Sequence, residues 1–193
     1  MAKFQPWFQK IALPCVAAAF HIYCGYTVTG RENIPNGCVI CPNHSDVIDP
    51  PMVAAAMGNK YPIRIMAKKE LFGGGFFDGL ITWLGAFPVD RSRADITAIK
   101  TALQAVKDGK KLMIFPQGTR GAGEHEAKEG AAMLALKTRA PIVPVYITEK
   151  KGFRTHARVV IGKPFLPDPQ NKDYAAVSED ILRRIYALRG EVR

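Results

Sequence analysis

Short apolar runs rich in β-branched residues alternate with segments of helical periodicity through most of the chain. The apolar runs predict buried strands, and the periodic segments between them predict helices. Strands that alternate with helices favour an α/β fold, in which a mostly parallel sheet is flanked by helices and ligands bind at the carboxyl ends of the strands. The predicted strands are residues 21–30, 38–42, 61–67, 86–91, 110–115, 141–147 and 157–162, and the predicted helices are residues 50–57, 76–85, 94–107, 128–137 and 174–188.

The size and charge of the chain limit what it can do. At 193 residues it is long enough for one compact domain and too short for two, so a single site is expected. The 27 basic residues exceed the 17 acidic ones, and the net charge of +10 attracts nucleic acid, an anionic bilayer, a phosphorylated metabolite or an acidic carrier protein. The aromatic residues fall in apolar runs rather than among basic residues, which argues against nucleic-acid binding. Taken one at a time, the basic residues near loops or strand ends, Lys151 among them, are each predicted to lie on a solvated face.

The N-terminal segment has the character of a helix at a membrane surface. Aromatic residues stand beside lysines ahead of an apolar run at residues 11–20. This run is too short to span a bilayer, which needs about 20 residues, and no signal-peptide cleavage site follows it. We therefore expect a membrane-interface helix over residues 1–20 and one further domain over residues 21–193. A helix packed on the core fits these residues equally well, and Pro14 is expected to kink the helix or to start it.

The cysteines do not form a convincing metal site. All four lie in the first quarter of the chain, mostly in apolar runs, as expected in a reducing compartment where cysteine behaves as a small hydrophobe. Cys38, Cys41 and His44 could suggest zinc by their spacing. However, residues three apart in a strand point to opposite faces, and a second pair at ligand spacing is missing from the sequence. We expect no metal.

The stretch "NHSDVID" carries the first candidate for chemistry, His44 and Asp49. On an ideal helix these two side chains would lie about 140° apart, so they can meet only in a turn. Pro42 before the stretch, and Pro50 with Pro51 after it, disfavour a continuous helix. A carboxylate that holds one imidazole nitrogen makes the other a general base, whereas "GxSxG", the signature of a serine hydrolase, is absent from the sequence. By spacing alone, an Asp49 that caps a helix beside an incidental histidine is the more frequent arrangement.

The stretch "FPQGTR" carries the second candidate, an anion site. Gly118 and Thr119 offer backbone amides and a hydroxyl in a tight loop beside Arg120, a combination that binds phosphate. Arg91 ends another strand in "GAFPVDR" and could converge on the same anion, and Lys128 is a third basic candidate. A β-turn with a surface arginine is the alternative reading.

Four motifs together resemble those of a known family. "NHSDVID", "GAFPVDR", "FPQGTR" and "APIVPVYI" occur in the order and approximate spacing of the glycerolipid acyltransferases that carry the NHxxxxD motif, and "MAKKELF" is similar to the segment between their first two motifs. The resemblance covers roughly residues 30–165. Four ordered motifs are far more specific than any one of them.

The resemblance implies a role for each matching residue. His44 would be the general base that deprotonates the acceptor hydroxyl, and Asp49 would orient His44. The residues that would contact the acceptor's phosphate and glycerol are Arg91, Gln117, Gly118, Thr119, Arg120 and Lys128. The residues that would lie beside the acyl chain are Pro141, Ile142, Val143 and Pro144.

The activity implied is acyl transfer from acyl-CoA or acyl carrier protein to the sn-2 hydroxyl of 1-acyl-glycerol-3-phosphate (lysophosphatidic acid), which gives phosphatidic acid. Such an enzyme would need no cofactor or metal. It would have the glycerolphosphate acyltransferase-like α/β fold and would lie on the cytoplasmic side of an anionic membrane as a peripheral protein.

One residue departs from the family pattern. The third motif usually has Glu where this chain has Gln117, which keeps the size and a carbonyl acceptor but loses the charge. An acyltransferase for another lysolipid or for a lyso-aminolipid is therefore an alternative. A non-catalytic basic module that binds membrane or nucleic acid is a further alternative.

Overall fold

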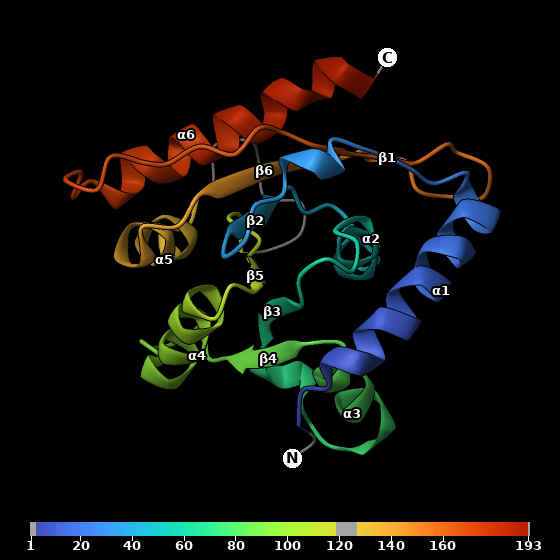
Figure 1. The fold of residues 1–193 in the computed structure, drawn as a ribbon, viewed down its shortest axis with the longest axis horizontal. Coiled ribbons are helices and arrows are strands. Elements are labelled where there is room, and N and C mark those ends of the chain that lie inside the picture. Colours follow the sequence, from blue (N-terminus) through green and yellow to red (C-terminus); the bar gives the residue numbers. More distant parts are fainter. Residues whose placement is uncertain (1–2, 119–126, 193) are drawn as a thin grey trace.

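The computed structural model describes residues 3–118 and 127–192, and seven strands in this part of the chain form one sheet (Figure 1). The strand order is β1-β7-β6-β2-β5-β3-β4, and neighbouring strands are parallel except for the antiparallel pair β6 and β7. The strands are β1 (Thr27–Thr29), β2 (Val39–Pro42), β3 (Ile63–Lys68), β4 (Ala86–Val89), β5 (Lys111–Met113), β6 (Ile142–Ile147) and β7 (Arg158–Ile161). The predicted α/β fold with a mostly parallel sheet is confirmed.

Helices cover both faces of the sheet and give a three-layer arrangement (Figure 1). On one side α1 packs against α2 and, at its other end, against α3, whereas α4, α5 and α6 cover the opposite face. The helices are α1 (Pro6–Cys24), α2 (Asp49–Ala56), α3 (Gly75–Trp83), α4 (Ile96–Lys107), α5 (Gly130–Thr138) and α6 (Tyr174–Ala187). Short 3-10 segments lie at Arg31–Asn33, Lys69–Leu71 and Leu188–Val192.

The central strands contribute side chains to two cores. In β6, Val143, Val145 and Ile147 belong to the core beneath α1 and α2, whereas Ile142 and Tyr146 belong to the core beneath α4, α5 and α6. A strand that is buried on both faces needs apolar residues at nearly every position. This explains why the sequence of β6 is a continuous apolar run rather than an alternating one.

Helix α1 extends four residues further than predicted, so the predicted strand at residues 21–30 is wrong over 21–24. Gly25 ends the helix in the left-handed conformation at φ 64°, where glycine carries no steric penalty, and its amide donates to the carbonyl of His21 at 3.0 Å. Cys24 is fully buried against the core, so the last turn continues the packed side of the helix.

Hydrogen bonds from two polar side chains, Asn59 and Gln9, hold α1 on the rest of the protein. Pro14 lies inside the helix and lacks the amide that would bond to Lys10, and the Lys10 carbonyl instead accepts a hydrogen bond from Asn59 Nδ2 at 3.1 Å. The buried side chain of Gln9 donates to the carbonyls of Ile63 at 2.7 Å and Leu84 at 2.8 Å. The packing of this helix on the core is therefore established.

The outward side of α1 is apolar. Trp7, Ile11 and Ile22 are 59%, 61% and 80% exposed, and Pro14 and Ala18 are exposed between them. At 3.6 residues per turn these five positions lie within about 80° of one another around the helix axis. We call them the α1 apolar stripe. Among the described helices, none combines the length and apolarity needed to cross a bilayer.

Candidate active site

The motif residues collect at one edge of the sheet. β2 pairs in parallel with β5 and β6, and β3 pairs in parallel with β4 and β5, so all five carboxyl ends lie at the same edge. His44 follows β2, Gln117 follows β5 and Arg91 follows β4. The topology therefore brings together residues from three separate motifs.

Asn43 fixes the start of the first motif. Its buried side chain pairs with the backbone of Ile147 at the end of β6, donating from Nδ2 to the carbonyl at 2.9 Å and accepting from the amide at 2.7 Å. The side chain thus extends the sheet by one ladder step. The position of the next residue, His44, is set by this anchor.

His44 and Asp49 are in contact, as predicted. His44 Nδ1 lies 3.0 Å from Asp49 Oδ2, and the same oxygen accepts hydrogen bonds from the backbone amides of Ser45 and Asp46, each at 2.7 Å. Asp49 is the first residue of α2, and prolines occupy the next positions, where helix amides have no partner. The carboxylate therefore gathers the whole turn around itself.

The Asp49 carboxylate is fully buried and ionised. Burial alone would raise the pKa of Asp49, but hydrogen bonds from His44 and the Asp46 amide, together with the ammonium of Lys151, hold it below its ordinary value. Lys151 Nζ lies 2.7 Å from Asp49 Oδ1, and the Lys151 side chain is 1% exposed. The prediction that Lys151 is solvated is wrong.

The ring of His44 is oriented for base chemistry. Its Nδ1 faces an ionised carboxylate, so Nδ1 carries the hydrogen and Nε2 is the nitrogen that can accept a proton. The ring lies against Phe115, with ring centroids 4.2 Å apart and planes inclined by 32°. The His44 side chain is 15% exposed, so the ring is not sealed in the core.

The second and third motifs meet at Gly118. Arg91 Nη1 donates a hydrogen bond to the Gly118 carbonyl, and the side chain of Lys128 passes over Gly118. Gly118 has φ +70°, and a Cβ there would lie 3.1 Å from Lys128 Cγ, so both the backbone conformation and the close approach favour glycine. Two basic side chains are thus gathered at one turn, as the anion-site prediction requires.

Gln117 connects this turn to His44. Its Oε1 accepts a hydrogen bond from the backbone amide of His44 at 2.9 Å, and its Nε2 donates to the hydroxyl of Tyr186 in α6 at 3.0 Å. The side chain is buried, with 1% of its surface exposed. Gln117 therefore holds protein groups in place, and its predicted contact with substrate stays a prediction.

The other predicted site residues belong to the third and fourth motifs. Thr119 and Arg120 lie outside the described residues. Ile142 and Val143 have no exposed surface, so these side chains form the core of the sheet rather than the wall of an open groove. Pro144 is buried too, and Pro141 is half-buried. The predicted contact of these four residues with an acyl chain stays untested.

Residues 25–148, well over half of the chain, match the family model described as Acyltransferase. The chain belongs to the acyltransferase family. The enzyme class predicted from the four motifs is confirmed by this match.

Several curated proteins are similar to this acyltransferase. The 1-acyl-sn-glycerol-3-phosphate acyltransferase of Bacillus subtilis (strain 168) is 33% identical over 181 residues, which cover 87% of this chain and 90% of that protein. The protein of the same name from Streptococcus pneumoniae is 36% identical over 121 residues, which cover 61% of this chain and 45% of that protein. The chain spans about half the length of several other curated relatives.

A solved structure shares the fold of this acyltransferase. The crystal structure of the 1-acyl-sn-glycerophosphate (LPA) acyltransferase PlsC from Thermotoga maritima matches with a TM-score of 0.70 over 96% of this chain and 82% of that chain. Sequence identity to that structure is 23%, so the likeness establishes the fold.

Sequence reasoning missed several residues of the acyltransferase site. Asn43 and Phe115 lie inside quoted motifs, but their contacts depend on the packing of β6 and on the direction of the His44 ring. Asp90 was also missed: its carboxylate accepts from Lys69 Nζ at 2.8 Å, and that hydrogen bond is the largest cause of a lowered pKa of Asp90. This contact ties the "MAKKELF" segment to the second motif. The basic and acidic spacing of Lys69 and Asp90 gave no usable signal.

Three of the four cysteines are core residues, whereas Cys15 is exposed on α1. Cys38 and Cys41 are fully buried, and burial raises the pKa of both thiols, that of Cys38 to about 12. Protonated thiols are poor metal ligands. Within the described residues, His, Cys, Asp and Glu side chains form no cluster of three that could hold a metal ion.

Proposed function

We propose that this acyltransferase transfers an acyl group from an acyl thioester to the sn-2 hydroxyl of 1-acyl-glycerol-3-phosphate and produces phosphatidic acid. The observation that carries the proposal is the 3.0 Å contact between His44 Nδ1 and Asp49 Oδ2. Gln117 joins this turn to the neighbouring turn at Gly118, where Arg91 and Lys128 meet and form what we call the basic pole. The names of the curated relatives support the same acceptor.

The chemistry follows from the orientation of His44. Nε2 accepts the proton of the acceptor hydroxyl while the hydroxyl oxygen attacks the thioester carbonyl carbon, and the carbonyl π electrons move onto oxygen. When this tetrahedral adduct collapses, the C–O double bond re-forms, the C–S bond breaks and sulfur takes the electron pair. The imidazolium then gives its proton to the thiolate, which regenerates neutral His44. A thioester is already activated for this step, so the proposed reaction requires no metal or prosthetic group.

The acceptor would be positioned by its phosphate. Arg91 and Lys128 converge on Gly118, and the Gln117 side chain spans the distance from this turn to the His44 backbone. A phosphate bound at the basic pole therefore places the glycerol hydroxyls on the His44 side. Thr119 and Arg120 follow directly in the sequence and keep their predicted part in this site.

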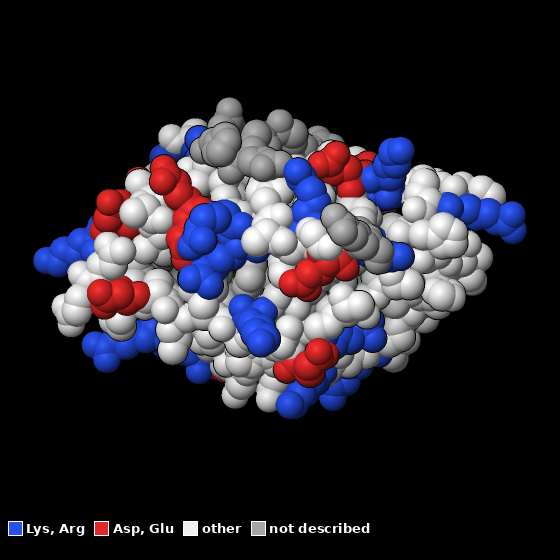
Figure 2. All heavy atoms as spheres, turned by 90° about the horizontal axis from the view of Figure 1, so that it is seen from above, with Lys and Arg blue, Asp and Glu red and all other residues white. Residues whose placement is uncertain are grey.

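The acceptor and product are lipids, so we infer that the enzyme works at the cytoplasmic surface of an anionic membrane. The α1 apolar stripe supports this placement because it offers exposed apolar side chains on a helix fixed to the sheet. On the face drawn in Figure 2, basic side chains are interspersed with acidic ones rather than gathered into one stripe. The thioester donor would be acyl-CoA or acyl carrier protein, both of which are acidic, and the net charge of +10 favours either.

The geometry of Gln117 bears on the alternative acceptors. The side chain is buried and is bonded to protein groups, the His44 amide and the Tyr186 hydroxyl. The change from Glu therefore gives no specific reason to propose another lysolipid as acceptor.

The test is thiol release from an acyl thioester in the presence of 1-acyl-glycerol-3-phosphate or of a phosphate-free monoacylglycerol. We expect turnover with the phosphorylated acceptor and a loss of about 100-fold or more in kcat for His44→Ala, because a positioned base contributes at least that much. His156→Asn is the matched control, since His156 is an exposed histidine away from the motifs. Full turnover in His44→Ala, or a preference for monoacylglycerol, would reject the proposal.

A further inference from the structure

The loop between β6 and β7 inserts a buried charge into the catalytic pair. Lys151 lies four residues after the end of β6, and its side chain is 1% exposed. Its ammonium lies 2.7 Å from Asp49 Oδ1 and 2.5 Å from Ser45 Oγ. The contact with Oδ1 has the geometry of an ion pair rather than of an aligned hydrogen bond.

The two carboxylate oxygens of Asp49 have separate partners. Oδ2 receives His44 Nδ1 and the amides of Ser45 and Asp46, whereas Oδ1 faces Lys151. A carboxylate with 0% exposure that met only a neutral imidazole and two amides would be costly to bury. The ammonium offsets this cost and also limits the rotation of the carboxylate, because each oxygen is held from a different direction.

The charge of Lys151 also acts on His44 through Asp49. A buried carboxylate without a counter-ion would stabilise the protonated imidazole strongly, and a histidine that stays protonated cannot act as a base. With Lys151 in place, the carboxylate and the ammonium form a neutral pair next to the ring.

The other groups that surround the pair are neutral except for Asp46. The third motif contributes the neutral amide of Gln117 to the His44 backbone and the ring of Phe115 to the His44 side chain. Asp46, on the same turn, accepts from the amide of Ile48 at 3.2 Å. Among the described residues that contact His44 and Asp49, Lys151 is thus the cation of the pair.

We propose that Lys151 is a positioning residue of the catalytic pair, which holds the Asp49 carboxylate with Oδ2 toward His44 and offsets its charge so that His44 stays available as a base. The proposal rests on the proposed function for its kinetic consequences. Its structural part, the coupling between Lys151 and Asp49, does not depend on any activity.

The kinetic test compares Lys151→Met, Lys151→Arg and the matched control Lys150→Met, which removes an exposed lysine from the same loop. We expect Lys151→Met to lower kcat at neutral pH by about 10-fold or more, with KM for both substrates changed by less than about 2-fold. The acid limb of its kcat profile should move to higher pH by on the order of one pH unit, because a nearby positive charge has been removed. Lys151→Arg should recover most of the rate and of the profile, and Lys150→Met should match the wild type.

A second measurement keeps the proposal testable without turnover. In urea unfolding, Asp49→Asn and Lys151→Met should each destabilise the protein, and the double variant should be more stable than the sum of the two losses predicts, because neither charge is then left unpaired. Additive losses would overturn the proposal, as would an unshifted pH profile in an active Lys151→Met enzyme. If the wild-type protein transfers no acyl group, the proposed function is rejected. The coupling between Lys151 and Asp49 is then tested by urea unfolding alone.

Discussion

Asp49 joins the chemistry of the site to its stability, because its carboxylate orients His44 and also neutralises a buried lysine. Removing its charge has two separate consequences. The imidazole loses the acceptor that fixes its tautomer, and Lys151 loses its counter-ion.

We expect Asp49→Asn to lower kcat by about 100-fold or more and to reduce the free energy of unfolding by about 3 to 5 kcal/mol, the range for breaking a buried ion pair. An asparagine amide can donate to Nδ1, which moves the ring hydrogen to Nε2 and removes the base. Steady-state turnover and urea unfolding measure the two effects. Asp46→Asn is the control, since an asparagine oxygen there can still accept from the Ile48 amide. A variant that is inactive but fully stable would contradict the ion pair with Lys151.

The residues that sequence reasoning located are those whose neighbours in the chain define them. His44 and Asp49 were predicted to meet because the flanking prolines force a turn. Gly118 was predicted to lie in an anion-binding loop because a strand ends just before it. Lys151 was misjudged because a lysine in a loop is usually solvated. Its burial depends on where the β6–β7 loop lies over α2, which no local pattern encodes. The contacts of Gln117 with His44 and Tyr186 are likewise tertiary.

Helix α2 is held at both ends by buried lysines from distant parts of the chain. Lys151 pairs with Asp49 at its first residue, and Lys111 Nζ donates to the carbonyls of Met57 and Gly58, each at 2.8 Å, just beyond its last turn. These carbonyls are helix-end groups that lack intrahelical partners, and a cation there also complements the helix dipole. The helix that presents Asp49 is therefore fixed from both ends.

Burial lowers the pKa of Lys111 from 10.5 to about 8, and this predicts a dependence of stability on pH. Between these two values the unfolded chain binds the Lys111 proton and the folded protein does not, so this residue's contribution to stability rises with pH. Relative to Lys111→Met, the wild type should gain up to about 1.4 kcal/mol per pH unit in that window. The measurement is urea unfolding of both proteins at about pH 7.5, 8.5 and 9.5, which gives the difference between their free energies of unfolding at each pH. A constant difference across these pH values would contradict the prediction.

At the level of elements, the sequence predicted the type and order of nearly all strands and helices. The prediction failed at residues 21–24. The alternation of tyrosine and threonine in "HIYCGYTVTG" indicated a strand from residue 21, whereas α1 continues to Cys24. The buried Cys24 and the glycine that follows it decide the boundary, since packing on the core continues the helix as far as a residue that can reverse the chain. The order of the strands in the sheet, and thus the meeting of three motifs at one edge, needed the structure.

The whole molecule presents one apolar helix face that the core does not use. The α1 apolar stripe runs along a helix whose inner side is anchored by Gln9 and Leu13, so deleting residues 1–20 would damage the core as well as the surface. Substitutions limited to the exposed side chains are the cleaner test of membrane binding.

We expect the triple variant Trp7→Gln, Ile11→Gln and Ile22→Gln to bind vesicles of phosphatidylglycerol and phosphatidylethanolamine at least about 10-fold more weakly than the wild type, because each apolar side chain gains about 1.5 to 3 kcal/mol on burial. Thermal unfolding should be unchanged, since all three side chains are exposed. The matched control is Ile96→Gln with Leu166→Gln, two exposed apolar residues elsewhere on the surface. Co-sedimentation with vesicles is the measurement, and equal binding by all three proteins would remove the stripe from the membrane proposal.

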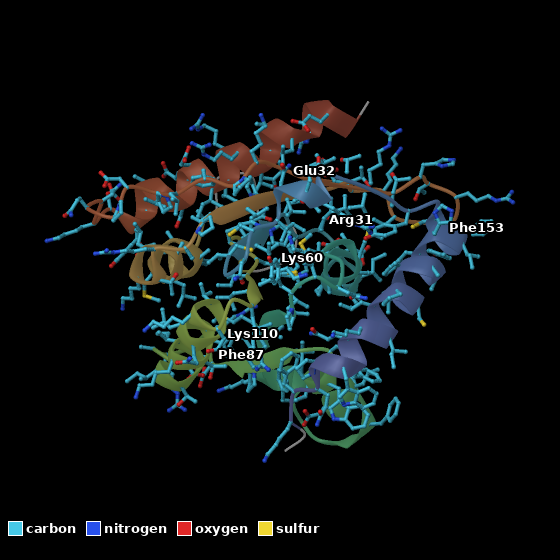
Figure 3. The ribbon with its side chains drawn as sticks, in the orientation of Figure 1. Arg31, Glu32, Lys60, Phe87, Lys110 and Phe153 are labelled. Carbon is cyan, nitrogen blue, oxygen red and sulfur yellow. The ribbon has the colours of Figure 1, made fainter. Side chains whose placement is uncertain are left out.

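The loop between β6 and β7 contacts both helix α1 and the pair formed by His44 and Asp49. Three residues after Lys151, the amide of Arg154 donates to the carbonyl of Tyr23 near the end of α1 at 3.0 Å, and Phe153, labelled beside that end in Figure 3, lies with its ring 6.1 Å from the ring of Tyr23. A tilt of α1 against the sheet would therefore pull on the segment that seats the ammonium next to Asp49. If α1 lies on a bilayer as proposed, only three residues of the loop separate the helix that meets lipid from the ammonium beside the histidine, and a change in bilayer composition would then be expected to alter the turnover rate without any lipid entering the site.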